Sequence, residues 1–195
     1  MICGLLGGSF DPVHNGHVAL VDHVLASGLA DRIVVVPARR SPLKEAASAP
    51  PPDRLAMTEL AFAGRAHVVV DPRETRREGP SYTVDTLRAL VAEHPGDSWR
   101  LIIGADNLAD LPRWRDVSGL LALAEVLVLQ RSGVAAGIPP GMNPNRFRFV
   151  TDFDEPVSST AVRAMLARGK LPAADLPPGV AAHIRQHGLY GFPRS

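Results

Sequence analysis

The sequence of 195 residues contains one cysteine, Cys3, so no disulfide can form within the chain. This scarcity fits a reducing cytoplasm, which is the location that we expect. No apolar run approaches the roughly 18 residues of a membrane span. The apolar N-terminus lacks the basic segment of a signal peptide and runs directly into Gly7 and Gly8, so we expect a first strand there. These features exclude a disulfide scaffold and predict no membrane partner.

A strong charge of either sign is also lacking. The 21 Lys and Arg residues are balanced by 20 Asp and Glu residues, which gives a formal net charge of +1. No basic stripe with interleaved aromatic residues occurs along the chain, so we expect no nucleic-acid partner.

What the sequence does contain is a regular alternation of apolar runs and helical periodicity. The uninterrupted run Ile33-Val34-Val35-Val36 is typical of a strand covered on both faces. Strands are predicted at residues 2–6, 32–37, 67–70, 100–103, 125–130 and 147–150. Helices are predicted at residues 16–26, 53–62, 83–94, 116–123, 159–168 and 178–187. The alternation predicts an α/β fold, a doubly wound parallel sheet, in one domain over residues 1–195 with a small helical C-terminal end at about 151–195.

Three polar loops follow predicted strands at their carboxyl ends, at residues 38–52, 71–81 and 132–145. Open α/β sheets bind ligands at this edge, so the loops are candidates for ligand contact. Composition alone leaves open that they are ordinary solvated loops.

The strongest chemical signal lies between the first strand and the first helix, at residues 7–17, and we call it the first motif. Its two glycines, Gly7 and Gly8, allow the backbone to approach a ligand closely. The following helix start offers free N–H groups to a phosphate. His14 and His17 are three residues apart, so at a helix start both can face one point. The segment lacks the Gly-Lys-Ser/Thr of a Walker loop and the Gly-x-Gly-x-x-Gly of a dinucleotide fingerprint.

A second motif, Val157-Ser158-Ser159-Thr160-Ala161-Val162-Arg163, precedes and opens a predicted helix. Ser158 or Ser159 can cap that helix, and Arg163 lies on the same side of its first turns as Ser159. Arginine can bind phosphate oxygens through two parallel hydrogen bonds. Taken alone, this segment would more often be a capped helix with a surface arginine.

Together the two segments resemble the (T/S)FDPxHxGH and ISSTxxR signatures of the HxGH nucleotidyltransferase superfamily. Nearly the whole chain is similar to the bacterial nicotinate mononucleotide adenylyltransferases, whose fold is Rossmann-like. The segments that carry this closer resemblance are Ser81–Leu87, Gly104–Leu108, Leu111–Trp114 and Gly188–Tyr190. The family often has Pro-Pro-His-Lys after the second strand, and here Leu43 replaces the histidine while Lys44 is kept.

The resemblance implies a role for each matching position. The implied ATP site comprises Gly7, Gly8, Ser9, Phe10, His14, His17, Gly104, Asp106, Ser158, Ser159, Thr160 and Arg163. The implied acceptor site comprises Lys44, Thr83, Leu111, Trp114 and Arg131, with the pyridine ring against the Trp114 indole. The implied catalytic groups are His14, His17, Lys44 and Arg163. No protein ligand to a metal is assigned.

The function expected from this resemblance is transfer of AMP from ATP to nicotinate mononucleotide, giving deamido-NAD and pyrophosphate in NAD biosynthesis. Mg²⁺ is expected on the triphosphate, held mostly by phosphate oxygens and water. The alternatives are transfer to nicotinamide mononucleotide or phosphopantetheine, and a nucleotide-binding sensor without turnover. The sequence gives no oligomeric state.

Overall fold

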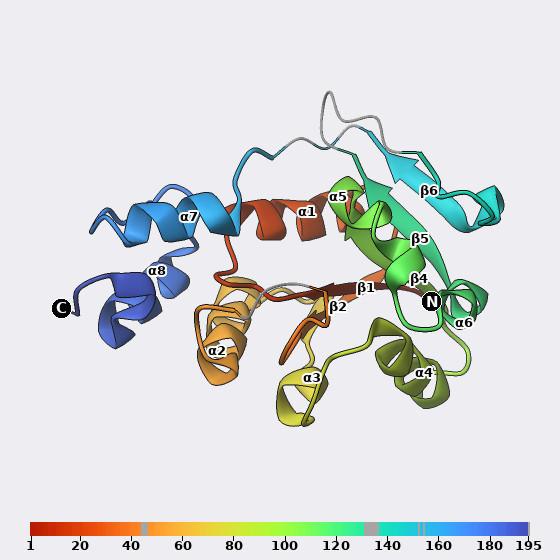
Figure 1. Ribbon diagram of the computed structural model, residues 1–195, viewed down its shortest axis with the longest axis horizontal. Helices are drawn as coiled ribbons and strands as arrows, with labels where there is room; N and C mark the ends of the chain where they lie inside the picture. The colour runs from red at the N-terminus through yellow and green to blue at the C-terminus, as the bar shows by residue number, and fades with distance from the viewer. Residues whose placement is uncertain (44–46, 131–136, 152, 154, 195) are drawn as a thin grey trace.

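The computed structural model describes residues 1–43, 47–130, 137–151, 153 and 155–194. Within this part, six parallel strands form one sheet in the order β3-β2-β1-β4-β5-β6 (Figure 1). The strands are β1 (Ile2–Gly8), β2 (Arg32–Pro37), β3 (Val68–Val70), β4 (Ser98–Gly104), β5 (Ala124–Leu129) and β6 (Phe147–Val150). This is the strand order of the doubly wound dinucleotide-binding fold, so the predicted fold class is confirmed.

The first six helices alternate with the strands, and the last two follow β6 as the predicted helical C-terminal end. The helices are α1 (Asn15–Ala26), α2 (Pro51–Phe62), α3 (Arg73–Arg76), α4 (Thr83–Glu93), α5 (Ala105–Leu108), α6 (Val117–Leu123), α7 (Ser159–Leu166) and α8 (Pro178–His187), with short 3-10 turns η1 (Leu111–Arg113), η2 (Pro144–Arg146) and η3 (Leu189–Gly191). Of these, α3, α5 and the 3-10 turns were not predicted. Helix α2 begins two residues earlier than predicted, because proline is well tolerated in the first turn of a helix.

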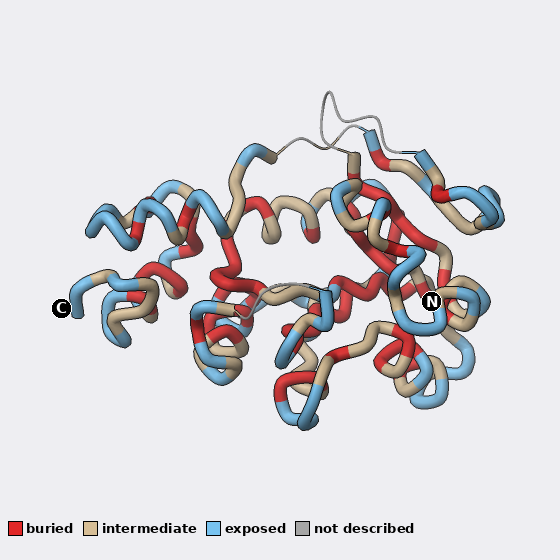
Figure 2. Tube along the Cα trace, viewed as in Figure 1, coloured by how far each residue is buried: buried red, intermediate tan, exposed pale blue. Residues whose placement is uncertain are grey.

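Each face of the sheet carries its own hydrophobic core. Leu6, Ile33 and Ile102 pack against α1, α2, α7 and α8 on one face. Cys3, Leu5 and their neighbours pack against α4 and α6 on the other. Alternate residues of β1 therefore enter different cores, which explains why its sequence is apolar throughout. Figure 2 shows the buried segments following the strands.

Helices α7 and α8 form the end of the molecule at which the C-terminus lies (Figure 1). Helix α8 packs along α2, and it ends at Gly188, whose φ of 64° is the left-handed conformation of a helix C-cap. None of the helices in the described residues is long and apolar enough to span a membrane.

Candidate active site

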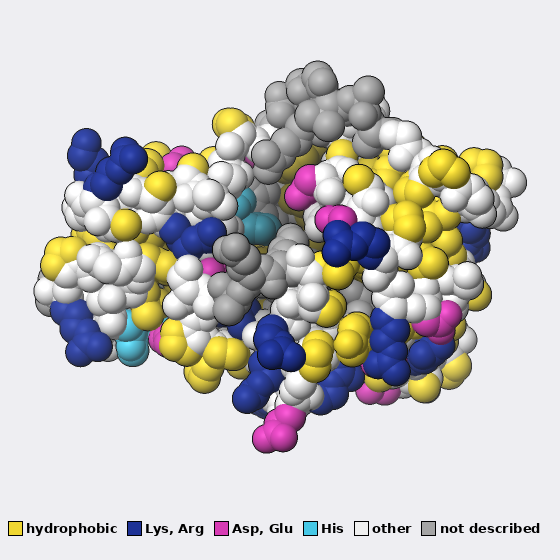
Figure 3. Space-filling view, in the orientation of Figure 1, with side chains coloured by type: hydrophobic (Ala, Val, Ile, Leu, Met, Phe, Trp, Pro, Cys, Tyr) yellow, Lys and Arg dark blue, Asp and Glu magenta, His cyan; other side chains and the backbone are white. Residues whose placement is uncertain are grey.

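A cavity of about 1200 Å³ opens at the carboxyl ends of the central strands. Its walls come from the first motif, the ends of β1 and β4, the start of α4, the segment around Trp114 and the start of α7. Figure 3 shows this hollow near the middle of the molecule, with histidine side chains inside it. Typical ligand pockets measure about 300–1000 Å³, so the cleft is as large as the largest of them.

The loop between β1 and α1 is buried over residues 10–14, which is unusual for a connecting segment (Figure 2). Phe10 and Val13 anchor it in the first core. A Cβ on Gly8 would lie 3.2 Å from the Phe10 ring, and one on Gly16 would lie 3.1 Å from the His14 ring. Gly8 and Gly16 therefore leave room for the rings that shape the loop, whereas a Cβ on Gly7 would meet nothing within 4 Å.

His14 and His17 lie together at the start of α1, with ring centroids 3.8 Å apart. The backbone N–H of His14 donates to Nδ1 of His17 at 3.2 Å. Because Nδ1 accepts a hydrogen bond, a neutral His17 carries its ring proton on Nε2. Both side chains line the cleft. The arrangement places two imidazole rings on the wall of the cleft at the start of α1, where the N–H groups of Asn15 and His17 already donate to the Asp175 and His14 carbonyl oxygens at 2.8 and 2.9 Å.

The second motif docks directly on the first. Ser158 caps α7 by accepting a hydrogen bond from the Ala161 N–H at 3.2 Å. The Ser159 hydroxyl donates to the Pro12 carbonyl at 2.9 Å, and Arg163 Nη1 donates to the Asp11 carbonyl at 2.7 Å. Residues about 150 positions apart in the sequence thus form one wall of the cleft, which also includes Thr160.

The Asp11 carboxylate joins three parts of the chain beneath this wall. It accepts hydrogen bonds from the backbone N–H groups of Ser48 and Ala49 at 2.7 and 3.0 Å, and from the Tyr190 hydroxyl at 2.9 Å. Burial, followed by the charge of Asp11, raises the pKa of Tyr190. Tyr190 therefore stays protonated and donates to Asp11.

Arg54 is a charged side chain that is only 1% exposed, and it binds the backbone of the first motif and of the loop after β2. Its guanidinium donates to the carbonyl oxygens of Ser9, Ala38, Arg39 and Ala49 at 2.6, 2.7, 2.8 and 3.1 Å. Burial lowers the pKa of Arg54. One side chain thereby ties the first motif to the loop that follows β2.

The opposite end of the cleft carries aromatic and basic groups. Tyr82, Thr83 and Trp114 line it, and the Arg115 guanidinium lies 4.7 Å from the centre of the Tyr82 ring. Thr83 is the first residue of α4. The N–H groups of Asp85 and Thr86 donate to the Tyr82 carbonyl, and those of Thr83 and Val84 stand at the helix start, where the helix itself offers no acceptor. Leu111 is fully buried in the second core, so its side chain supports Trp114 rather than facing the cleft.

Glu74 is a buried carboxyl group on the wall of the cleft. The Thr86 hydroxyl donates to it. Burial is the largest influence on Glu74 and raises its pKa.

The remaining predicted site residues divide between the cleft and the undescribed segments. Gly7, Gly8, Ser9, Gly104 and Asp106 line the cleft, as does Leu43, which replaces the family histidine. Lys44 and Arg131 lie outside the described residues.

Sequence reasoning assigned no role to Asp11, Arg54 or Tyr190. Asp11 stands inside the first motif, and that position was the signal that could have identified it. Arg54 carries no such signal, because a single arginine in an amphipathic helix is usually solvent-exposed. Its role depends on four carbonyl groups that only the tertiary fold brings together.

Comparison with known proteins identifies the family of this fold and cleft. A cytidylyltransferase-like family model matches residues 5–165. A probable nicotinate-nucleotide adenylyltransferase of Roseiflexus sp. (strain RS-1) is 40% identical over 194 residues, covering 96% of both chains. The chain belongs to the nicotinate-nucleotide adenylyltransferases of the cytidylyltransferase-like family. A second such relative, from Albidiferax ferrireducens, is 43% identical over 192 residues, again covering 96% of both chains.

A solved structure shares the fold of this adenylyltransferase. It is the Plasmodium falciparum nicotinic acid mononucleotide adenylyltransferase complexed with NaAD, with a TM-score of 0.78, 18% identity and 98% of each chain covered. The resemblance expected from the sequence is therefore confirmed at the level of family and fold.

Proposed function

We propose that the protein transfers AMP from ATP to nicotinate mononucleotide and releases deamido-NAD and pyrophosphate. The observation that carries this proposal is the docking of the two motifs on each other through Ser159 and Arg163. That docking lines one wall of the cleft with a hydroxyl and a guanidinium group, which are suited to bind phosphate. The names of the relatives supply the acceptor.

The reaction is in-line substitution at the α-phosphorus. A 5′-phosphate oxygen of the acceptor forms the new P–O bond as the bond to the pyrophosphate oxygen breaks. The acceptor phosphate is already ionised near neutral pH, so the step needs no strong general base. Catalysis then depends on positioning and on stabilisation of the developing charge.

Four side chains supply that stabilisation in our proposal. His14 and His17 face the triphosphate from the start of α1, and His17 offers its Nε2 proton. Arg163 approaches from α7, and its Nη1 is held by the Asp11 carbonyl at 2.7 Å. Lys44 is the proposed contact to phosphate from the loop after β2.

The residues of the cleft fit a Mg²⁺ ion carried on the triphosphate. Asp106 contributes a carboxylate to the wall of the cleft, and Gly104 beside it leaves room for that group. Carboxylate and water oxygens suit Mg²⁺ together with phosphate oxygens. Bound there, the ion would neutralise charge on the leaving pyrophosphate.

Selection of the acid over the amide is proposed to occur between α4 and Trp114. The N–H groups at the start of α4 and the Thr83 hydroxyl can donate to a carboxylate. The Arg115 guanidinium lies over the Tyr82 ring and also pairs with the Asp85 carboxylate at 3.3 Å, so the proposed selection depends on the N–H and hydroxyl donors and not on the charge of Arg115. A carboxamide would place an NH₂ group against one of these donors.

Residues 1–195 are proposed to act as one nucleotidyltransferase domain, because the C-terminal segment supplies Arg163 and Tyr190 to the first motif. A cytoplasmic location is proposed from the lone cysteine, which is buried.

The deciding experiment is mass spectrometry of the products formed from ATP and an equimolar mixture of nicotinate mononucleotide, nicotinamide mononucleotide and phosphopantetheine. The proposal expects deamido-NAD as the main product. A main product from either other acceptor would overturn the assigned substrate. Nucleotide binding without pyrophosphate release would favour a sensor.

A further inference from the structure

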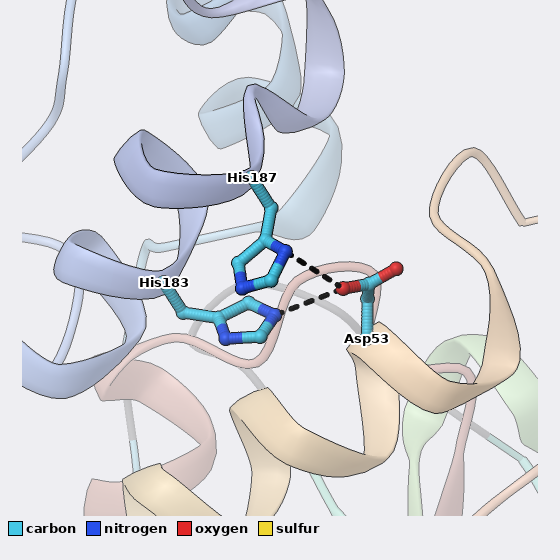
Figure 4. Close-up of side chains that lie close together, drawn as sticks. All are labelled: Asp53, His183 and His187. Carbon is cyan, nitrogen blue, oxygen red and sulfur yellow. Dashed lines mark hydrogen bonds and ion pairs between the residues drawn. The ribbon is translucent and has the colours of Figure 1, made fainter. Parts of the chain in front are cut away.

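Three metal-binding side chains converge at the junction of α2 and α8, outside the cleft. They are Asp53, His183 and His187, and we call them the α2–α8 cluster (Figure 4). Asp53 lies in the first turn of α2, and the two histidines lie four residues apart in the last two turns of α8. None of these three side chains is among the described residues that line the cleft.

Both imidazoles are directed at one carboxylate oxygen. His183 Nε2 lies 3.0 Å from Asp53 Oδ1, and His187 Nδ1 lies 4.0 Å from the same atom (Figure 4). The second distance is too long for a hydrogen bond. The His187 ring also stacks on the His183 ring, with centroids 4.2 Å apart. Stacking explains why the two rings are adjacent, and a shared ion would in addition explain why both present a nitrogen to the same carboxylate oxygen.

The spacing fits a small transition-metal ion. The three ligand atoms all lie within 4.8 Å of one another. Ligands at about 2.0–2.1 Å from a tetrahedral ion lie about 3.3 Å apart, so closure needs shifts of at most about 1.5 Å. Histidines four residues apart on one helix face are a recurrent way to present two zinc ligands.

Exposure and ligand chemistry define the kind of site. The side chain of His183 is 13% exposed, that of Asp53 22%, and that of His187 44%. Entry is therefore open on the His187 side, where water can provide a fourth ligand. Two imidazoles with one carboxylate suit Zn²⁺, whereas Mg²⁺ prefers oxygen ligands throughout. The C-terminal end of α8 also favours a cation.

We propose that the α2–α8 cluster binds one Zn²⁺ ion and clamps α8 onto α2. The clamp would act on the region that shapes the phosphate site. Arg54 follows Asp53 directly and holds the first motif, and Tyr190 follows α8 and donates to Asp11. The proposed ion is structural and takes no part in the transfer reaction.

The test uses the full-length protein freed of metal and titrated with Zn²⁺ by calorimetry, with no nucleotide present. We expect one ion per chain and a rise in Tm of about 5 °C or more at a free Zn²⁺ concentration about 100 times Kd. Mg²⁺ alone should give no rise. Absence of Zn²⁺ binding, or an equal response to Mg²⁺, would overturn the proposal.

Variants assign the ion to these residues. His187→Ala is the main test because this side chain is half-exposed, so the loss of its ring contact with His183 should change the metal-free Tm only slightly. We expect His187→Ala, His183→Ala and Asp53→Asn each to raise Kd for Zn²⁺ at least about 100-fold. The exposed His67 gives a matched control, since His67→Ala should bind Zn²⁺ like the wild type.

The histidine pair in the cleft is the competing location for the ion. His17→Ala should retain Zn²⁺ binding if the ion lies at the α2–α8 cluster. Binding that survives His187→Ala but is lost in His17→Ala would overturn the proposal. Binding of Co²⁺ gives an independent readout, because its visible absorption should be lost in His187→Ala and kept in His17→Ala.

Discussion

Replacement of Arg54 by methionine should destabilise the protein strongly although it removes no substrate contact. Methionine keeps much of the aliphatic volume but leaves the carbonyl groups of Ser9, Ala38, Arg39 and Ala49 without this donor. A buried acceptor left without its donor costs about 1–3 kcal/mol, and because such costs do not add fully for neighbouring groups we take about 3–5 kcal/mol for the four carbonyl groups together. Burial of the guanidinium itself is unfavourable, as its lowered pKa indicates, so we expect the lower part of that range. For a chain of this length the loss corresponds to roughly 6–15 °C in Tm.

The assay is thermal and denaturant unfolding of Arg54→Met beside Arg65→Met. Arg65 is a matched control because its side chain is 34% exposed and its partner, Asp22, lies at the surface. A surface ion pair contributes about 0–1 kcal/mol, so Arg65→Met should stay within about 1 kcal/mol of the wild type. Well below Tm, Arg54→Met should also raise KM for ATP, because the Ser9 loop loses its support. An Arg54→Met protein as stable as Arg65→Met would refute the reasoning.

Four further outcomes are expected. His17→Ala should lower kcat about 10²-fold with a smaller change in ATP affinity, because its hydrogen bond strengthens as charge develops; steady-state kinetics with kcat near wild type would remove His17 from the catalytic set. Arg163→Lys should lower kcat/KM despite keeping the charge, since lysine cannot contact phosphate and the Asp11 carbonyl through one planar group; full activity would show that a point charge suffices. Trp114→Ala should raise KM for nicotinate and nicotinamide mononucleotide alike, because both lose the stacking surface. At least about a 10²-fold preference for the acid in kcat/KM should remain. Equal kcat/KM values for the two acceptors in the wild type would contradict the assigned acceptor. Glu74 keeps its proton in the folded state at pH values where the unfolded chain has lost it, so stability should fall as pH rises above the ordinary glutamate pKa of 4.5. Glu74→Gln should flatten that decline in Tm scans from about pH 4 to pH 8, and an unchanged slope would assign it to other groups.

The strands were predictable because both faces of a doubly wound sheet are covered. An uninterrupted apolar run such as Ile33-Val34-Val35-Val36 has few other uses in a chain without a membrane-length segment. The short helices α3 and α5 were not predictable, since four residues give no helical periodicity to detect. Their formation depends on contacts with the sheet and neighbouring loops rather than on a local pattern.

Some residues of the candidate site were likewise predictable from the sequence and others were not. His14, His17 and Arg163 were recognisable because each stands in a motif whose residue types suit phosphate. Arg54 and the α2–α8 cluster were not, because their partners come from segments that only tertiary packing unites. Asp53 and His183 are 130 residues apart. A pattern of local spacing cannot contain such a pair.

The position of Asp11 explains why the phosphate end of the cleft requires most of the chain. Its carboxylate takes hydrogen bonds from the loop after β2 and from the segment after α8, and its backbone carbonyl takes one from α7. These bonds fix the loop that leads into His14 and His17. A misplacement of about 1 Å can cost about 10²-fold in rate when catalysis depends on positioning. Tyr190 and Arg54 therefore affect the rate without touching substrate, because they fix the position of the first motif.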